Sequence, residues 1–492
     1  MPSLKSIKNS SIQPDIVVDL HCHPFAKPFG YSHGKGLKHA TNAKQKNSVW
    51  FYDPPNALER LLNRLPGGLT KFRQSDMTSQ VRGQNRVIMA SLYPLEKGFL
   101  IKDGKQGLIR LLLNDLASGF SLKRLNHLRT MKDYFTDLEA MYQFYKDLDG
   151  KKVRSVGGQY AYHLVNDRED LDSILTDEPD DVAVILTIEG AQVLNTGLAE
   201  YVDGWSLDKH EVLNNIQKIK SWEHVPFFMT FAHHFNNDLC GHAPSMSGIV
   251  KKLTNQSTNL NEGFLPFGYE VLDALLNKSP KRILIDMKHM SALSRNDYRK
   301  HLRDHYGNDD IPLIVSHGAC SGLKSHDNRT PTNPRTSRFL RSDSINFYDE
   351  ELVAIAASNG IFGIQLDERR VASKAGLKDT NGGISRRKIL YQRAKLVWNN
   401  IQHIAEALDK SGQYPWGIQS IGSDFDGIVN PINGYWTAED YQYLDNALLL
   451  HASEYLNKYG GQLQHNGDTT PDEIVDRFMG GNAMDFIDRY FQ

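Results

Sequence analysis

The segment Val182-Ala183-Val184-Ile185-Leu186-Thr187-Ile188-Glu189 is a run of apolar, β-favouring residues that ends in a carboxylate. The run is continuous rather than alternating, which is typical of a parallel strand that is buried on both faces. Seven further runs have the same form, and they cover residues 16–21, 87–93, 227–233, 283–289, 313–317, 361–366 and 418–424. The chain therefore predicts eight parallel strands.

Patterns typical of helices separate several of these runs, at residues 268–276, 348–358 and about 387–408. Strands that alternate with helices predict an α/β fold, and eight such units predict a (β/α)8 TIM-type barrel. An open, doubly wound sheet is the alternative, but such a sheet rarely carries reactive residues at nearly every strand end. Two more helices are expected after the last strand, at about 437–458 and 471–490.

The chain has 492 residues, and barrels run from about 200 to over 400 residues as a single unit. We therefore expect one barrel domain over residues 1–492. The extra length lies at about 24–80, 94–180, 235–265 and 318–346, and each of these insertions follows a strand. They should lie at the C-terminal face of the barrel, where the loops after the strands build active sites.

The composition excludes several classes of protein. Hydrophobic residues make up 40% of the chain and charged residues 23%, which rules out a disordered, collagen-like or coiled-coil protein. The 57 Lys and Arg residues balance 58 Asp and Glu residues, so no global field favours nucleic acid or a membrane surface. Neither of these partners is therefore expected. The motifs described below predict a small-molecule substrate instead, and a homodimer is left open.

The cysteines and the chain ends indicate the compartment. Cys22, Cys240 and Cys320 are odd in number and far apart, which favours reduced thiols. Met1–Asp15 lacks the apolar run of a signal peptide, and no apolar stretch is long enough to cross a bilayer. These features predict a cytoplasmic protein.

His21-Cys22-His23 is the first sign of chemistry. Residues two apart in a strand point the same way, so both imidazoles can reach one point beyond the strand end, and neutral imidazoles suit zinc. Glu189 places a carboxylate, which can bridge two metals, at the end of another strand. Taken alone, the histidines could be a surface pair and the glutamate a helix cap or a salt-bridge partner.

Three more strands end in residues of this kind, namely His289, His317 and Asp424. Each histidine alone could be a core residue, and Asp426, two residues after Asp424, could be a turn residue. All strand ends of a barrel surround one axis, so these side chains and those of the first and third strands should converge. The combined set predicts a two-metal site with an open position for water.

The motifs resemble, in order along the chain, those of the membrane (renal) dipeptidase family of the amidohydrolase superfamily. They are Asp19-Leu20-His21-Cys22-His23, Ile188-Glu189-Gly190, Thr230-Phe231-Ala232-His233-His234-Phe235-Asn236, Pro266-Phe267-Gly268-Tyr269-Glu270-Val271, Ile285-Asp286-Met287-Lys288-His289-Met290-Ser291, Ser316-His317, Gly422-Ser423-Asp424-Phe425-Asp426-Gly427 and Gly480-Gly481-Asn482. The resemblance implies a (β/α)8 barrel with two divalent metal ions, with zinc as the first choice. It implies that Glu189 bridges the ions, that His21 and His23 hold one, and that His289 and His317 hold the other.

The same resemblance implies roles for residues that contact the substrate. His233 is similar to the histidine that polarises the scissile carbonyl, and Asp424 to the acid that shuttles the proton. Arg341 is similar to the arginine that receives the substrate carboxylate, with Arg329 as a rival. His234, next to His233, is expected to point to the opposite side and to be structural.

The chain also departs from the family, which usually has an aspartate where this sequence has His23. Imidazole in place of carboxylate removes a negative charge and should alter metal preference. The predicted function is a metal-dependent hydrolase, a dipeptidase in the first instance. The alternatives are another reaction of the amidohydrolase type, on an N-acyl amino acid, lactone or phosphoester, and a metal-binding or sugar-binding scaffold that has lost catalysis.

Overall fold

The computed structural model describes residues 16–62, 72–102, 105–106, 119–246, 248–383, 385–427 and 429–492. The predictions for Met1–Asp15, and those for parts of the insertions 24–80 and 94–180, lie outside the described residues.

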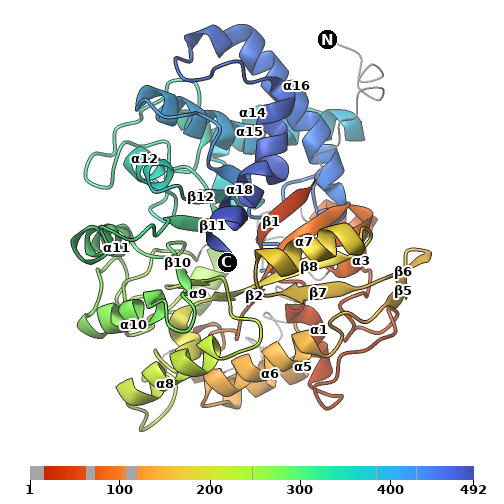
Figure 1. Ribbon diagram of the computed structural model, residues 1–492, viewed down its shortest axis with the longest axis vertical. Coiled ribbons are helices and arrows are strands. Elements are labelled where there is room, and N and C mark those ends of the chain that lie inside the picture. The colour runs from red at the N-terminus through yellow and green to blue at the C-terminus, as the bar shows by residue number, and fades with distance from the viewer. Residues whose placement is uncertain are drawn as a thin grey trace.

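Eight parallel strands close into a barrel, as predicted, and the open-sheet alternative is excluded (Figure 1). The ring closes because β1 pairs with the last strand on one side and with β2 on the other, and β2 in turn pairs with β8. In order around the ring the strands are β1 (Val17–Cys22), β2 (Asn85–Leu92), β8 (Val182–Glu189), β9 (Phe228–Thr230), β10 (Leu284–Asp286), β11 (Ile314–Gly318), β12 (Ile361–Ile364) and β13 (Gln419–Ile421).

The continuous apolar runs are buried on both faces of the sheet. Every residue of β1 and of β8 is buried, and the side chains that do not fill the barrel pack against the surrounding helices. Each fully buried Val, Ile or Leu side chain contributes roughly 1.5–3 kcal/mol relative to exposure. Burial of both faces therefore holds the strands in the closed ring.

Helices cover the outside of the barrel (Figure 1), and the helices expected from the sequence are confirmed. The predicted C-terminal helix is divided by a wider turn at Arg477–Gly481, where a Cβ on Gly480 would lie 1.9 Å from the Ile16 carbonyl oxygen. The main outer helices are α8 (Lys209–Lys220), α10 (Pro266–Leu276), α11 (Ala292–His305), α12 (Asp349–Ala357), α15 (Arg386–Lys410), α16 (Tyr441–Tyr459), α17 (Pro471–Asp476) and α18 (Asn482–Tyr490).

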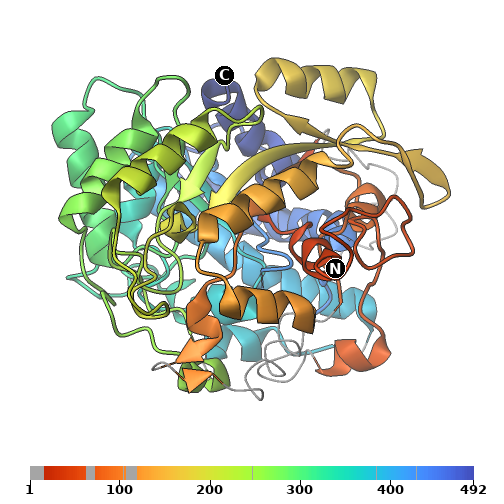
Figure 2. The same cartoon turned by 90° about the horizontal axis from the view of Figure 1, so that it is seen from below.

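The insertion 94–180 adds a ninth strand to the sheet. Strand β7 (Tyr162–Val165) pairs with the first half of β8, whereas the last two residues of β8 pair with β9 on the same edge. The helix that follows, α7 (Arg168–Asp177), lies beside α18 (Figure 2), where Arg168 forms an ion pair with Asp488.

The remaining elements lie mostly in the insertions. They are α1 (Ala26–Ser32), α2 (Ala57–Leu62), α3 (Met77–Arg82), β3 (Ile101–Lys102), β4 (Lys105–Gln106), α5 (Leu122–Thr130), α6 (Tyr134–Lys146), β5 (Val153–Ser155), β6 (Gly158–Tyr160), α9 (Gly248–Leu253), α13 (Glu368–Val371) and α14 (Lys374–Asp379). In the described ranges, no helix has both the length and the apolar character needed to cross a bilayer.

Candidate metal centre

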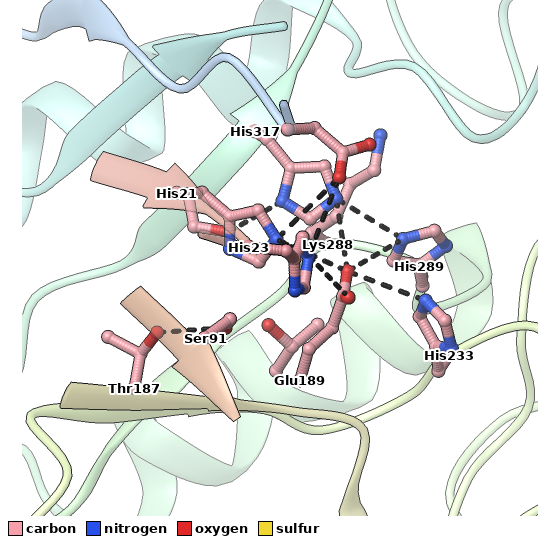
Figure 3. Close-up of polar contacts among 12 residues, drawn as sticks. His21, His23, Ser91, Thr187, Glu189, His233, Lys288, His289 and His317 are labelled. Atoms are coloured by element: carbon pink, nitrogen blue, oxygen red, sulfur yellow. Dashed lines mark hydrogen bonds and ion pairs between the residues drawn. The ribbon is translucent and has the colours of Figure 1, made fainter. Parts of the chain in front are cut away.

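The carboxylate of Glu189, the last residue of β8, lies where five histidine side chains meet (Figure 3). All of them are buried, and they come from β1, from β11 and from the loops that follow β1, β9 and β10. The Nε2 atoms closest to its carboxylate oxygens are those of His23 at 3.2 Å, of His21, His233 and His317 at 3.4 Å, and of His289 at 3.6 Å. The structure thus brings together every residue predicted as a metal ligand.

The ring nitrogens face one another in pairs. His21 Nε2 lies 3.1 Å from His23 Nε2, and His289 Nε2 lies 3.3 Å from His317 Nε2. Only one proton fits between two facing nitrogens, so at least one nitrogen of each pair directs a lone pair at the other nitrogen. A proton or a cation close to the pair satisfies that lone pair.

The protonation state of the histidines also suits metal binding. Burial lowers the pKa of His23, His289 and His317, which favours the neutral imidazole that ligates metals. The Nδ1 atoms of His23 and His289 have no hydrogen-bond partner among the described residues, although both are buried. Burial also opposes protonation of His21, but the charge of Glu189 outweighs it and raises the pKa of His21. A carboxylate beside the three neutral, buried imidazoles of His23, His289 and His317 fits divalent cations such as zinc.

Asp424 lies at the edge of this group, three residues after the end of β13. Its Oδ1 lies 3.6 Å from His23 Nε2 and 3.9 Å from His21 Nε2, and its Oδ2 accepts a 2.6 Å hydrogen bond from Gln365 Nε2. Burial, and after it the charge of Glu189, raises the pKa of Asp424 to about 8. Such a carboxyl exchanges a proton close to neutral pH.

Two site residues have backbone conformations that residues other than glycine rarely adopt. The φ angle is 65° at His289 and 60° at Asp424, in the left-handed region that favours glycine. Strain of this kind costs on the order of 1–3 kcal/mol and persists where the surroundings hold it in place. The fold therefore maintains both side chains in the centre at a cost in stability.

Glu96 is a site residue that the sequence did not reveal. It is buried, and its Oε2 lies 2.5 Å from His233 Nδ1, while the backbone N–H of Phe235 donates to its Oε1 at 3.1 Å. Burial disfavours the imidazolium of His233, but Glu96 and Glu189 outweigh it and raise the pKa of His233 to about 10. Glu96 thus fixes the proton on Nδ1 and leaves Nε2 directed at Glu189.

Two strand ends without a predicted site residue also contribute side chains to the centre. Tyr93 directly follows β2; its ring centroid lies 4.8 Å from that of His233, and its hydroxyl has no partner among the described residues. Gln365 directly follows β12 and contacts both Asp424 and Lys288, whose Nζ donates to Gln365 Oε1 at 3.4 Å. Their positions at the ends of the second and seventh apolar runs were the signal that could have found them.

Lys288 is the fourth site residue that the sequence did not reveal, and it lies next to His289. Its side chain is fully buried within the centre (Figure 3). Burial, and then the charge of Arg370, lowers the pKa of Lys288 to about 7. When it is protonated, the buried amine of Lys288 places a positive charge on one side of the site, where it interacts with the carboxylate of Asp424.

The predicted carboxylate receptor lies outside this cluster. Arg341 is 39% exposed and its Nε pairs with Asp343 at 2.8 Å; in the described ranges, no hydrogen bond or ion pair joins its side chain to the centre. The rival Arg329 is exposed and donates to the Ser342 carbonyl oxygen. The charge of Arg370 acts on both Lys288 and Asp424, and its guanidinium donates to the carbonyl oxygen of Ser245 at 2.5 Å.

The expectation for His234 was wrong. Its ring centroid lies 3.9 Å from that of His233 and 4.8 Å from that of His289, so it does not point to the opposite side. The alternation of side chains holds only in extended strand, and β9 ends at Thr230. His234 Nδ1 bonds the Ser245 hydroxyl at 2.7 Å, and His233, His234 and His289 together form a second group with the spacing of metal ligands.

Two buried aspartates hold the backbone close to the histidines of the centre. Asp19 accepts hydrogen bonds from the backbone N–H groups of His21 and Ser423 and from two hydroxyls, those of Ser423 and Tyr441. Asp286 does the same on the other side of the barrel. It accepts from the N–H groups of Lys288 and Ser316 and from the hydroxyls of Ser316 and Thr230.

Comparison with known proteins relates the fold to solved structures. No known protein family matches the chain by its sequence model, and no curated protein matches it. A metallopeptidase described as dipeptidase AC, of peptidase family M19, is 13% identical with a TM-score of 0.54, over 97% of this chain and 99% of that one. A metallopeptidase from Rhodobacter sphaeroides, liganded with a phosphinate mimic of the dipeptide L-Ala-D-Ala, is also 13% identical with a TM-score of 0.54, over 96% and 99%. At this identity the likeness shows the shared fold.

Proposed function

We propose that the protein is a metal-dependent hydrolase, and more specifically a dipeptidase of the membrane (renal) dipeptidase family. The observation that carries this proposal is the buried carboxylate of Glu189 with five imidazole nitrogens within 3.6 Å. The ordered motifs of the sequence support the same family. The dipeptidase named among the solved structures that share the fold supports it further.

The ligands in this proposal are those that the motifs predict. Glu189 would be shared between two ions, His21 and His23 would hold one, and His289 and His317 would hold the other. When bound, two divalent cations such as zinc supply Lewis-acid chemistry, because they lower the pKa of water from about 15.7 towards about 7 and polarise a carbonyl oxygen. The remaining steps belong to the residues of the chain.

Asp424 moves the proton. Its Oδ2 is held by Gln365, so Oδ1, which faces His21 and His23, is the atom that exchanges the proton. The positive charge of the bound cations would favour the ionised form of Asp424, and this carboxylate then takes a proton from the attacking water. The same Oδ1 passes that proton to the leaving amine, so Asp424 acts first as base and then as acid.

His233 stabilises the negative charge that develops on the carbonyl oxygen. Glu96 holds its Nδ1 at 2.5 Å, so the ring is fixed before the substrate arrives and Nε2 is available as a donor. A fixed donor of this kind contributes roughly 3–4 kcal/mol to the transition state. Glu96 acts only through His233 and is a positioning residue.

The substrate carboxylate binds on the side of the site that carries positive charge. The arginine predicted for this contact is Arg341, and its fork would fit a carboxylate bidentately. Arg370 competes for the role because it lies close enough to act on Asp424 and Lys288. The insertions form the walls around the substrate, since Glu96 and Ser245, from two of them, contact His233 and His234.

The proposed function is tested with a substrate panel and metal analysis. Zinc-loaded protein is assayed on L,L and L,D dipeptides, N-acyl amino acids, lactones and phosphoesters, with Asp424→Asn as the inactive control. We expect dipeptide hydrolysis by the wild type that is absent in the control. Turnover of another substrate class alone would replace the dipeptidase assignment. Two bound metals with no turnover on any substrate would favour the scaffold that has lost catalysis.

A further inference from the structure

A cleft whose lining includes no residue of the metal centre opens beside the β5–β6 hairpin. It has a volume of about 850 Å³ and lies between residues 41–52, helix α3 and the β5–β6 hairpin. Figures 1 and 2 both place the β5–β6 hairpin at the edge of the molecule. Clefts that bind small molecules have volumes of roughly 300–1,000 Å³, so this one is large enough for a ligand.

The charged residues that line this cleft are all positive. Lys44, Arg82 and Arg154 contribute cations, and no Asp or Glu is among the lining residues. Arg82 pairs with Glu439 at 3.1 Å, whereas the charged groups of Lys44 and Arg154, both exposed, have no ion pair within the described part of the chain. Two cations are thus available to an anion.

The sequence around the cleft has the same bias. From Leu20 to Tyr52 the chain contains no Asp or Glu, while Lys occurs at positions 27, 35, 38, 44 and 46. The whole protein, by contrast, has a net charge of −1. Lys27 is buried and pairs with Asp426 at 2.8 Å, and of the other four lysines Lys44 lines the cleft. The segment that builds this wall therefore carries net positive charge, which favours an anionic ligand.

Aromatic residues form the other part of the lining. Trp50, Phe51 and Tyr52 follow one another along the wall, and the ring of Trp50 stacks on Tyr160. Trp50 is fully buried and its indole Nε1 has no acceptor among the described residues. Because Trp50 is fully buried, the accessible part of this wall is formed by the half-buried side chains of Phe51 and Tyr52. Aromatic side chains beside cations suit a planar ring.

The rim of the cleft carries backbone strain. Val156, at the tip of the β5–β6 hairpin, has a φ of 50° and is 41% exposed. A two-residue hairpin turn with positive φ favours Asn or Gly at this position, because a β-branched side chain is strained there. Stability alone does not account for an exposed valine at the rim.

We propose that this cleft binds a small molecule that joins an aromatic ring to a phosphate, as in a nucleoside monophosphate. The phosphate contacts Lys44 and Arg154, and the ring lies against the aromatic wall. This site is independent of the proposed hydrolase function, since none of its lining residues belongs to the metal centre.

The test is calorimetric titration of the full-length protein with adenosine monophosphate, adenosine and inorganic phosphate. The double variant Lys44→Gln/Arg154→Gln removes both free cations, and neither exposed side chain makes a contact that the fold needs. Lys300→Gln, on α11, is the matched control because Lys300 is also exposed and lies outside the cleft.

We expect one adenosine monophosphate to bind per chain, more tightly than adenosine or phosphate alone. The double variant should weaken it by roughly 100-fold, about tenfold for each lost charge-assisted hydrogen bond, and the control should leave it unchanged. No heat at millimolar nucleotide would overturn the proposal. So would equal affinity for inorganic phosphate, or binding that the double variant does not alter.

Discussion

The half of the centre on β1 and β13 and the half on β10 and β11 are supported in the same way. In each half a buried aspartate accepts two backbone N–H groups on Oδ1 and two hydroxyls on Oδ2. Each aspartate, Asp19 or Asp286, binds the N–H two residues later and a serine of the neighbouring strand. The strand ends that present the histidines are thus held by one repeated arrangement.

The halves differ in the charged group that each adds to its histidines. The β1–β13 half carries Asp424, whose Oδ1 faces two imidazoles, whereas the β10–β11 half carries the buried amine of Lys288. A carboxyl whose pKa is raised therefore lies on one side and an amine whose pKa is lowered lies on the other. The shared arrangement holds the histidines in place, and Asp424 and Lys288 are the charged residues in which the two halves differ.

The largest effect is expected from the residue that both halves share. Glu189→Gln replaces the bridging carboxylate by a neutral amide, so affinity at both metal positions should fall by at least about 100-fold. Elemental analysis after dialysis measures this, with Glu200→Gln, an exposed residue of the loop after β8, as the control. Full occupancy of both positions in Glu189→Gln would remove its bridging role.

The second largest effect is expected from Asp424, which belongs to the β1–β13 half alone. Asp424→Asn keeps the shape of the side chain but cannot carry the proton, so turnover should fall by roughly 10²–10⁴-fold while both metals remain bound. Stopped assays on the best dipeptide, together with metal analysis, check both parts. Asp468→Asn, at an exposed position, is the matched control. Turnover unchanged in Asp424→Asn would refute the shuttle.

The smallest effect compares the two supporting aspartates. Asp19→Asn and Asp286→Asn each weaken charge-assisted hydrogen bonds to buried donors, so each should lower the free energy of unfolding by about 1–3 kcal/mol. Urea unfolding of the metal-free proteins measures the two values. Similar losses would support the equivalence of the halves, and a loss in only one variant would show that the arrangement matters on one side alone.

The sequence predicts the centre well because the barrel makes strand ends converge. His21, Glu189 and His317 could be identified from local runs, since each lies in the strand itself and alternation fixes its direction. The eight strands follow from the same continuous apolar patterns. No knowledge of loop conformation is needed for these positions.

Residues placed by loops are harder to predict. Glu96 reaches His233 from 137 positions away in sequence, inside an insertion with no periodic pattern. His234 turns inward because the chain leaves extended geometry after β9, and Arg341 follows a long loop whose path the sequence does not determine. The basic cleft depends likewise on how residues 41–52 pack against α3 and the β5–β6 hairpin.

The proposed function depends most on Glu189, which would bridge two cations between the two halves of the centre. Anomalous diffraction at the zinc edge, from crystals of the zinc-loaded protein, locates the ions directly. We expect two peaks roughly 3.5–4 Å apart, both bound to Glu189, one also to His21 and His23 and the other to His289 and His317. A single peak, or peaks that do not touch Glu189, would contradict it.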